Sequence, residues 1–257
     1  MHRQERDGRA GAQGVAHSAT GRGRAGRLPR EAWTWPSASL LGGLPPAARD
    51  RLLTLGALTR YPTGRVLMRE TEESTFVLIL LDGAVKATGR THDNREALLA
   101  VRMGGDLVGE FAAVDGRPRS ATVTTCGPVT ARVVTRGDFL DSMRHDELIA
   151  QAVNASIIAK LRVATTHRVD FTGCDAPTRL ARVLYQIAMA YGESTGAGAV
   201  IRWPITQPEL ATLAGTAEPT VHKALRKLRE AGVVSTGYRT FRVENLAELR
   251  QLAFGRR

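Results

Sequence analysis

The chain has 257 residues, of which 43% are hydrophobic and 24% charged, a composition typical of a globular protein with one large domain or two modest ones. Its longest uninterrupted apolar run covers residues 76–81, far short of the roughly 20 residues of a membrane-spanning helix, so we expect no membrane partner. Two cysteines exclude a disulfide framework or a four-thiolate metal site. The first thirty residues contain no apolar stretch of the secretory type, and we therefore expect a cytoplasmic protein.

The charge balance favours an anionic partner. Lys and Arg total 36 against 25 Asp and Glu, which gives a formal net charge of +11. A positive field attracts polyanions such as nucleic acid or anionic lipid. Nearly all of these cations are arginines, an excess that a GC-rich coding sequence could also produce, so charge alone predicts nucleic-acid binding only weakly.

Residues 1–38 form a basic, glycine-rich segment with little aliphatic periodicity. Such a composition buries too little apolar surface to offset chain entropy, so we expect a disordered extension. It could be a basic arm that touches phosphates, or it could reflect a translation start assigned too far upstream. No apolar stripe accompanies its arginines, so the segment does not indicate an amphipathic membrane helix.

Residues 61–134 alternate short apolar runs with turn residues. Short strands at this spacing predict an antiparallel sandwich or barrel. Just before them, residues 45–53 predict a short helix opened by proline. The strand candidates are residues 65–68, 76–81, 84–87, 97–101, 121–124 and 129–134.

The pattern becomes helical after Gly137. Ile149, Val153, Ile157 and Leu161 recur every four residues, which predicts an apolar stripe on a helix that extends to about residue 169. A long helix between two domains commonly pairs through such a stripe with a second copy of itself, so we expect a homodimer. The alternative is that the stripe packs on its own domain.

Residues 205–228 carry the pattern of a helix-turn-helix. Thr206 can cap a first helix, Gly215 supplies a tight turn, and a second helix begins near Pro219. This geometry places the second helix in a DNA major groove. Residues 232–243 then predict a β-hairpin that turns at Gly237, the wing of a winged helix. The expected DNA contacts are Thr206, Gln207, Thr220, His222, Lys223, Arg226, Lys227 and Arg239.

Residues 105–121 combine side chains that suit a phosphate joined to a sugar. Gly109 allows a ligand to approach the backbone closely, and the helical turn predicted after it would offer N–H groups to an anion. Arg119 and Ser120 supply a charged donor and a hydroxyl donor. The Glu110 carboxylate can accept from sugar hydroxyls. Each residue alone would mean little, and their order within a β-rich segment is the specific part.

With these motifs in this order, residues 39–254 resemble the cyclic AMP receptor protein and fumarate–nitrate regulator (Crp/Fnr) family of bacterial transcription factors. The resemblance implies an α+β fold, with a jelly-roll-like cyclic-nucleotide-binding β-roll over residues 39–137. A dimerisation helix over 138–171 and a winged helix-turn-helix domain over 172–257 would follow. The implied protein is a homodimer that binds double-stranded DNA under the control of a cyclic nucleotide, with cyclic AMP favoured over cyclic GMP. RNA polymerase is a further candidate partner.

The resemblance also implies roles for the ligand-binding residues. Arg119 and Ser120 would hold the cyclic phosphate, and Glu110 would hold the ribose 2′-hydroxyl. A hydroxyl pair on the long helix would meet the purine. Alignment of the helix places Ala164 and Thr165 there, with Thr166 next, and Thr165 and Thr166 are the candidates because they carry hydroxyls. The full expected set is Gly109, Glu110, Phe111, Ala112, Arg119, Ser120, Thr165 and Thr166.

The chain departs from the family pattern in several places. It lacks the cysteine cluster of the oxygen-sensing branch, so we expect no iron–sulfur cluster or other prosthetic group. Glu218 and Pro219 stand where the best-known member reads bases with arginine and glutamate, and Lys223 stands at a later arginine position. The operator should therefore differ from that member's operator.

Two alternatives stay open. The β-roll could be a relic or could bind an effector that is not a nucleotide, while the helix-turn-helix still binds DNA. More remotely, the chain could be the regulatory subunit of an enzyme. We expect no enzyme activity, because the sequence contains no nucleotide-hydrolysing glycine loop, no catalytic triad and no metal-ligand cluster.

Overall fold

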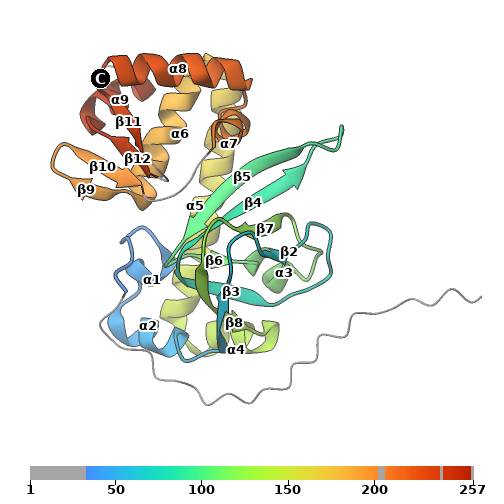
Figure 1. Ribbon diagram of the computed structural model, residues 1–257. Helices are drawn as coiled ribbons and strands as arrows, with labels where there is room; N and C mark the ends of the chain where they lie inside the picture. Colours follow the sequence, from blue (N-terminus) through green and yellow to red (C-terminus); the bar gives the residue numbers. More distant parts are fainter. Residues whose placement is uncertain (1–32, 202–205, 238–239, 256–257) are drawn as a thin grey trace, which may run out of the picture.

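The computed structural model describes residues 33–201, 206–237 and 240–255 (Figure 1). These residues form a β-rich N-terminal domain and a mixed C-terminal domain, with the long helix α5 between them. The predicted α+β class and the order of the parts are confirmed.

The N-terminal domain is a β-roll of two four-stranded antiparallel sheets. One sheet has the strand order β1-β8-β3-β6 and the other β2-β7-β4-β5. Alternate side chains of both sheets, such as Leu78 and Leu80 from β3 with Val85 from β4 and Val123 from β7, form the core between them. The strands are β1 (Ala57–Tyr61), β2 (Val66–Met68), β3 (Val77–Asp82), β4 (Ala84–Arg90), β5 (Glu96–Met103), β6 (Leu107–Val108), β7 (Thr122–Thr125) and β8 (Val129–Val134).

The opposite face of β3 is covered by helices. Ile79 and Leu81 pack with the fully buried Phe139 in a second core, which involves α1 (Leu40–Gly43), α2 (Pro46–Leu52), α4 (Arg136–His145) and the start of α5 (Glu147–Gly173). Because β3 is buried on both faces, its sequence is a continuous apolar run rather than an alternating one.

Residues 33–38 belong to this fold, contrary to the expectation of disorder up to residue 38. The indole Nε1 of Trp35 donates a 2.9 Å hydrogen bond to the carbonyl of Leu81. The side chains of Trp33 and Trp35 also pack against the helical core. Residues 1–32 lie outside the described residues.

The helix expected over residues 138–171 is two helices. The break falls at Asp146, whose backbone is extended (φ −135°, ψ 101°). Its carboxylate caps α5 by accepting from the amide of Leu148 at 3.1 Å and also pairs with Arg51 at 2.6 Å. The hydrogen bond from Arg51 lowers the pKa of Asp146 below its usual value. A side chain that satisfies the first amides of a helix fixes where the helix starts.

The first part of the apolar stripe of α5 packs on its own domain, and the later part is exposed, as a dimer contact would require. Ile149 and Val153 are buried in the core of their own domain, as the alternative supposed. Further along the helix, Ile158, Leu161 and Val169 are 50%, 64% and 62% exposed. In the described part of the chain, α5 is also the one helix long and apolar enough to cross a membrane by these two criteria alone. Its contacts with the β-roll place it within the fold.

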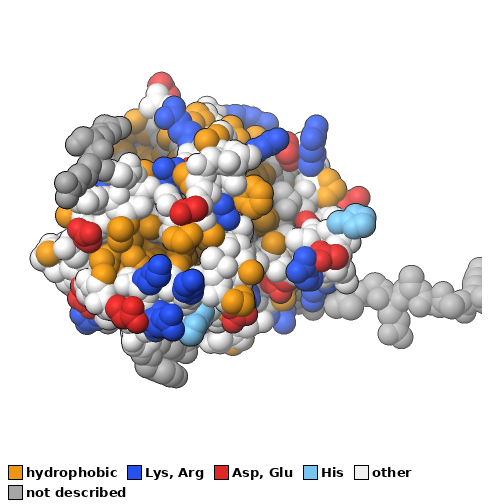
Figure 2. Space-filling model, turned by 90° about the horizontal axis from the view of Figure 1, so that it is seen from above, with side chains coloured by type: hydrophobic (Ala, Val, Ile, Leu, Met, Phe, Trp, Pro, Cys, Tyr) orange, Lys and Arg blue, Asp and Glu red, His pale blue; other side chains and the backbone are white. Residues whose placement is uncertain are grey.

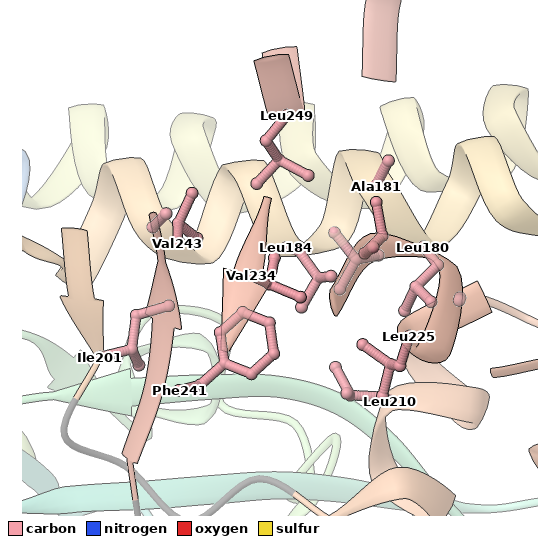
Figure 3. Packing of buried hydrophobic residues seen from close by; sticks show 14 of the residues in the cluster. Leu180, Ala181, Leu184, Ile201, Leu210, Leu225, Val234, Phe241, Val243 and Leu249 are labelled. Atoms are coloured by element: carbon pink, nitrogen blue, oxygen red, sulfur yellow. The ribbon is translucent and has the colours of Figure 1, made fainter. Parts of the chain in front are cut away.

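The C-terminal domain has the predicted winged helix-turn-helix. Leu180 and Leu184 of α6 pack against Leu210 of α7, Leu225 of α8 and Phe241 of β12 (Figure 3). The sheet has the order β11-β12-β10-β9. The elements are α6 (Ala176–Tyr191), β9 (Glu193–Thr195), β10 (Gly198–Ile201), α7 (Gln207–Leu213), α8 (Glu218–Glu230), β11 (Val234–Gly237), β12 (Thr240–Val243) and α9 (Leu246–Phe254).

Candidate functional site

A cavity of about 930 Å³ lies between the β-roll, α5 and the C-terminal domain. All six residues predicted for the phosphate and ribose end line it, and they come from the turn after β6, from the short helix α3 (Glu110–Asp115) and from the segment just before β7. The structure therefore brings this part of the predicted site together. These residues are Gly109, Glu110, Phe111, Ala112, Arg119 and Ser120.

These six residues are called the cradle below, and Gly109 allows them to pack closely. Its φ of +86° lies in the left-handed region, and a Cβ there would lie 2.6 Å from Nη1 of Arg119 and 2.9 Å from the carbonyl oxygen of Phe76. Only glycine fits both the conformation and the space. Gly109 is also the N-cap of α3 and provides no side-chain cap, which leaves the N–H groups at this helix start for a ligand.

Arg119 places a positive charge inside the β-roll. The side chain is buried, and it donates from Nη1 to the Gly109 carbonyl at 2.9 Å, from Nη2 to the Phe76 carbonyl at 2.7 Å and from Nε to Oγ of Ser74 at 3.0 Å. Burial lowers the pKa of the Arg119 guanidinium. No carboxylate of the described residues lies within ion-pair distance of it.

This arrangement suits an anion. Three of the five guanidinium N–H groups of Arg119 are used by neutral acceptors, so two are left. A buried cation held only by neutral acceptors favours a ligand that brings negative charge. Ser120, the next residue, is exposed at the cavity and adds a hydroxyl donor.

Glu110 is not a free carboxylate. Its Oε1 accepts a 2.7 Å hydrogen bond from Nζ of Lys160 on α5, and Lys160 also donates to the Leu107 carbonyl at 2.7 Å. Both side chains are buried. Burial lowers the pKa of Lys160, while the charge of Glu110 acts in the opposite direction. A sugar hydroxyl at Glu110 would share the carboxylate with Lys160.

Sequence reasoning missed Lys160. It stands 50 residues from Glu110, and no local motif marks it. The one available signal was a charged side chain three residues after Ile157, at the edge of an apolar stripe.

The predicted purine contacts do not lie in this cavity. Thr165 and Thr166 are exposed and are not among its lining residues, whereas Ala164 and His167 are. The helix turns by about 100° per residue, so a slip of one position exchanges a cavity-facing side chain for one that faces outward. Thr165 instead follows Leu161 by one helical turn and belongs to the exposed stripe. His167 bonds Gln186 of α6, with Nε2 2.8 Å from Oε1.

The candidate nucleic-acid interface is the outer face of α8. His222, Lys223, Arg226 and Lys227 are exposed along it, while Val221, Leu225 and Leu228 are buried beneath. Figure 2 shows Lys and Arg side chains beside apolar ones on the side of the molecule that carries α8. Thr220 and Gln207 are half-buried, and Thr206 is exposed at the start of α7. Arg239 lies outside the described residues.

The start of α7 is fixed by a capping box. The hydroxyl of Thr206 accepts from the amide of Glu209 at 3.3 Å, and the Glu209 carboxylate accepts from the amide of Thr206 at 2.9 Å. The predicted cap is therefore confirmed, and it fixes the N-terminus of α7 beside α8.

Comparison with known proteins agrees with this architecture. A model of the cyclic nucleotide-binding domain matches residues 58–146, and one of the Crp-like helix-turn-helix domain matches residues 178–252. The cyclic AMP receptor protein of Thermus thermophilus is 30% identical over 217 residues, which cover 84% of this chain and 97% of that protein. The chain belongs to the Crp/Fnr family of transcription regulators.

Two further comparisons support the same assignment. A CRP-like cAMP-activated global transcriptional regulator of Mycobacterium tuberculosis is 28% identical over 195 residues, 76% of this chain and 87% of that protein. The structure of FixK2 from Bradyrhizobium japonicum superposes with a TM-score of 0.67 at 21% identity, over 77% of this chain and 97% of the other. The latter is a likeness of fold.

The Glu110–Lys160 pair generates a stability prediction. Substitution of Lys160→Met leaves the Glu110 carboxylate buried without its cation, so we expect a loss of about 3–5 kcal/mol in the free energy of unfolding. The double variant with Glu110→Met should lose less than the sum of the two single variants. Denaturant unfolding measures all three.

The matched control is Arg144→Met, which breaks the exposed pair with Asp141 and should cost at most about 1 kcal/mol. A loss in Lys160→Met as small as that in the control would contradict the role given to the buried pair.

Proposed function

We propose that this protein is a cytoplasmic, homodimeric transcription regulator whose binding to DNA is controlled by a cyclic nucleotide in the cavity, with cyclic AMP favoured over cyclic GMP. The observation that carries the proposal is the buried Arg119 guanidinium, which only neutral acceptors hold. The names of the two curated relatives both refer to cyclic AMP. RNA polymerase is the further partner that we expect for a regulator of this kind.

In this proposal, different residues of the cradle bind the phosphate and the ribose of the ligand. Arg119 and Ser120 bind the cyclic phosphate together with the N–H groups at the start of α3. Glu110 accepts from the ribose 2′-hydroxyl and keeps its ion pair with Lys160. The charges of Glu72 and Glu110 attract the guanidinium without forming an ion pair with it. The phosphate would bring a negative charge into direct contact, so binding would offset part of the cost of burying Arg119.

Nucleotide binding is tested by calorimetric titration of the full chain with cyclic AMP and cyclic GMP. Arg119→Ala should weaken binding by about 100-fold or more, because it removes the charged partner of a desolvated phosphate. The matched control is Arg117→Ala, two residues earlier and exposed, which should bind like the wild type. Failure of the wild type to bind either nucleotide would contradict the proposal and favour a different effector.

The exposed half of α5 is the proposed dimer contact. Ile158, Leu161, Thr165 and Val169 follow one another at intervals of three, four and four residues, so they share one face of the helix. The same face of a second copy would cover these apolar side chains, as in a coiled coil.

We expect Leu161→Glu to convert the dimer to a monomer, because it places two carboxylates in an apolar contact. Sedimentation velocity at micromolar concentration measures the change. The control Leu252→Glu alters a comparably exposed leucine on α9 and should remain dimeric. A monomeric wild type, or a dimeric Leu161→Glu, would rule out this contact.

The exposed cations of α8 predict a salt-dependent affinity for DNA. We assign Thr220, His222 and Lys223 to base edges, and Arg226 and Lys227, with Thr206 and Gln207 of α7, to the phosphates. Lys227→Ala should lower the slope of log affinity against log salt concentration by about one per subunit, equally on all sequences.

Fluorescence anisotropy with labelled duplexes over a salt series measures this slope. Arg60→Ala removes an exposed cation from β1 and should leave the slope unchanged. Equal slopes for the wild type and Lys227→Ala would remove Lys227 from the phosphate contacts.

A further inference from the structure

The cavity extends well beyond the cradle, which forms only one end of it. From Arg119 it continues past α5 to Val183 of α6 and to residues 212–215, which are the end of α7 and the turn before α8. At about 930 Å³ it lies near the upper end of the roughly 300–1,000 Å³ of small-molecule sites. Part of its wall therefore belongs to the helix-turn-helix itself.

Specific bonds dock α7 on the β-roll. The hydroxyl of Thr212 accepts from the amide of Leu98 at 3.1 Å, and Nζ of Lys86 lies 3.2 Å from Oε1 of Glu209. Because β5 is the edge strand of its sheet, the outward amide of Leu98 has no strand beyond it, and Thr212 takes that place. Glu209 also caps α7, so one carboxylate joins the start of the helix-turn-helix to β4.

Apolar packing reinforces these bonds. Ala84, Leu98 and Val101 of the β4–β5 hairpin share one core with Leu210 and other residues of the C-terminal domain. Figure 1 shows the hairpin reaching up from the β-roll beside α7. The far wall of the cavity is thus held in place by contacts between the two domains.

The chemistry of this far region is mostly apolar. Leu98 and Leu99 of β5 face it together with Ala164, Val183 and Leu213. Several polar groups nearby have partners already: the carbonyls of Ala214 and Gly215 accept from Arg179, and His167 bonds Gln186. Such a wall accommodates a flat heterocycle by apolar contact. The arginines Arg102 and Arg168 also line the cavity.

We propose that the helix-turn-helix completes the effector site, so that the base of the nucleotide packs between β5 and Leu213 while the phosphate stays at Arg119. The inference rests on the proposed function. A ligand that touches both domains binds the docked arrangement more tightly and stabilises it, and docking raises the affinity for the ligand by the same factor.

The test is calorimetric titration of the full-length protein with cyclic AMP in the absence of DNA. Leu213→Ala removes apolar contact with the base and should weaken binding roughly 5- to 20-fold. Lys86→Met breaks the docking pair together with a longer contact, 4.0 Å, to the exposed Glu96 of β5. Lys86 is not among the residues that line the cavity, so a several-fold weaker affinity would not come from a lost contact with the ligand. The controls are Leu252→Ala on α9 and Arg60→Met on β1, both exposed, which should bind like the wild type.

Each outcome decides the inference. Wild-type binding with unchanged or tighter affinity in Lys86→Met and Leu213→Ala overturns it and leaves the proposed function standing. Absence of binding by the wild type overturns both. Thermal unfolding checks that each variant is folded; if Leu213→Ala is not, the half-exposed Lys86→Met decides alone.

Discussion

The cavity is organised around the buried positive charge of Arg119. Arg119 is desolvated inside the β-roll and is held by the carbonyls of Gly109 and Phe76 and the hydroxyl of Ser74. These partners come from separate segments that only the folded sheets bring together, and the close approach requires that residue 109 be glycine. A cation in this position costs free energy that neutral acceptors offset only in part. An anionic ligand at Arg119 would offset that cost, and Glu110 and Ser120 line the same cavity.

Helix α5 connects that place to the rest of the molecule. Lys160 ties the helix to Glu110 in the cradle, the exposed side chains from Ile158 to Val169 lie on the same helix, and Ala164 and His167 face the cavity. A ligand that changes how Glu110 shares its carboxylate acts directly on α5. The docked α7 adds a second connection, through β5. In this proposal the effector contacts α5 and α7, the two elements that connect the cavity to the C-terminal domain.

Much of the fold could be predicted from local patterns. The apolar runs of β3 and β8, the capping box at Thr206 and the glycine turn of the helix-turn-helix are signals that the chain carries within a few residues. The sequence did not reveal β1, which is largely exposed, or the two-residue strand β6. The break at Asp146 was missed although its cap on α5 is local; only its second partner, Arg51, lies 95 residues away.

The same distinction holds for the site. The six residues predicted for the phosphate and ribose end lie within one segment of about twelve residues, and all of them line the cavity. Lys160 and the α7 wall depend on contacts between segments 50 or more residues apart, which no local pattern encodes. Alignment placed Ala164 and Thr165 at the purine, and Thr165 and Thr166 were preferred because they carry hydroxyls, whereas the side chains that line the cavity are those of Ala164 and His167. The most direct test of nucleotide control is a selection of random double-stranded DNA by the wild type and by Arg119→Ala, each with and without cyclic AMP. We expect a two-fold-symmetric site to be enriched by the wild type with the nucleotide only; the same site enriched to the same extent in all four conditions would contradict control through this cavity.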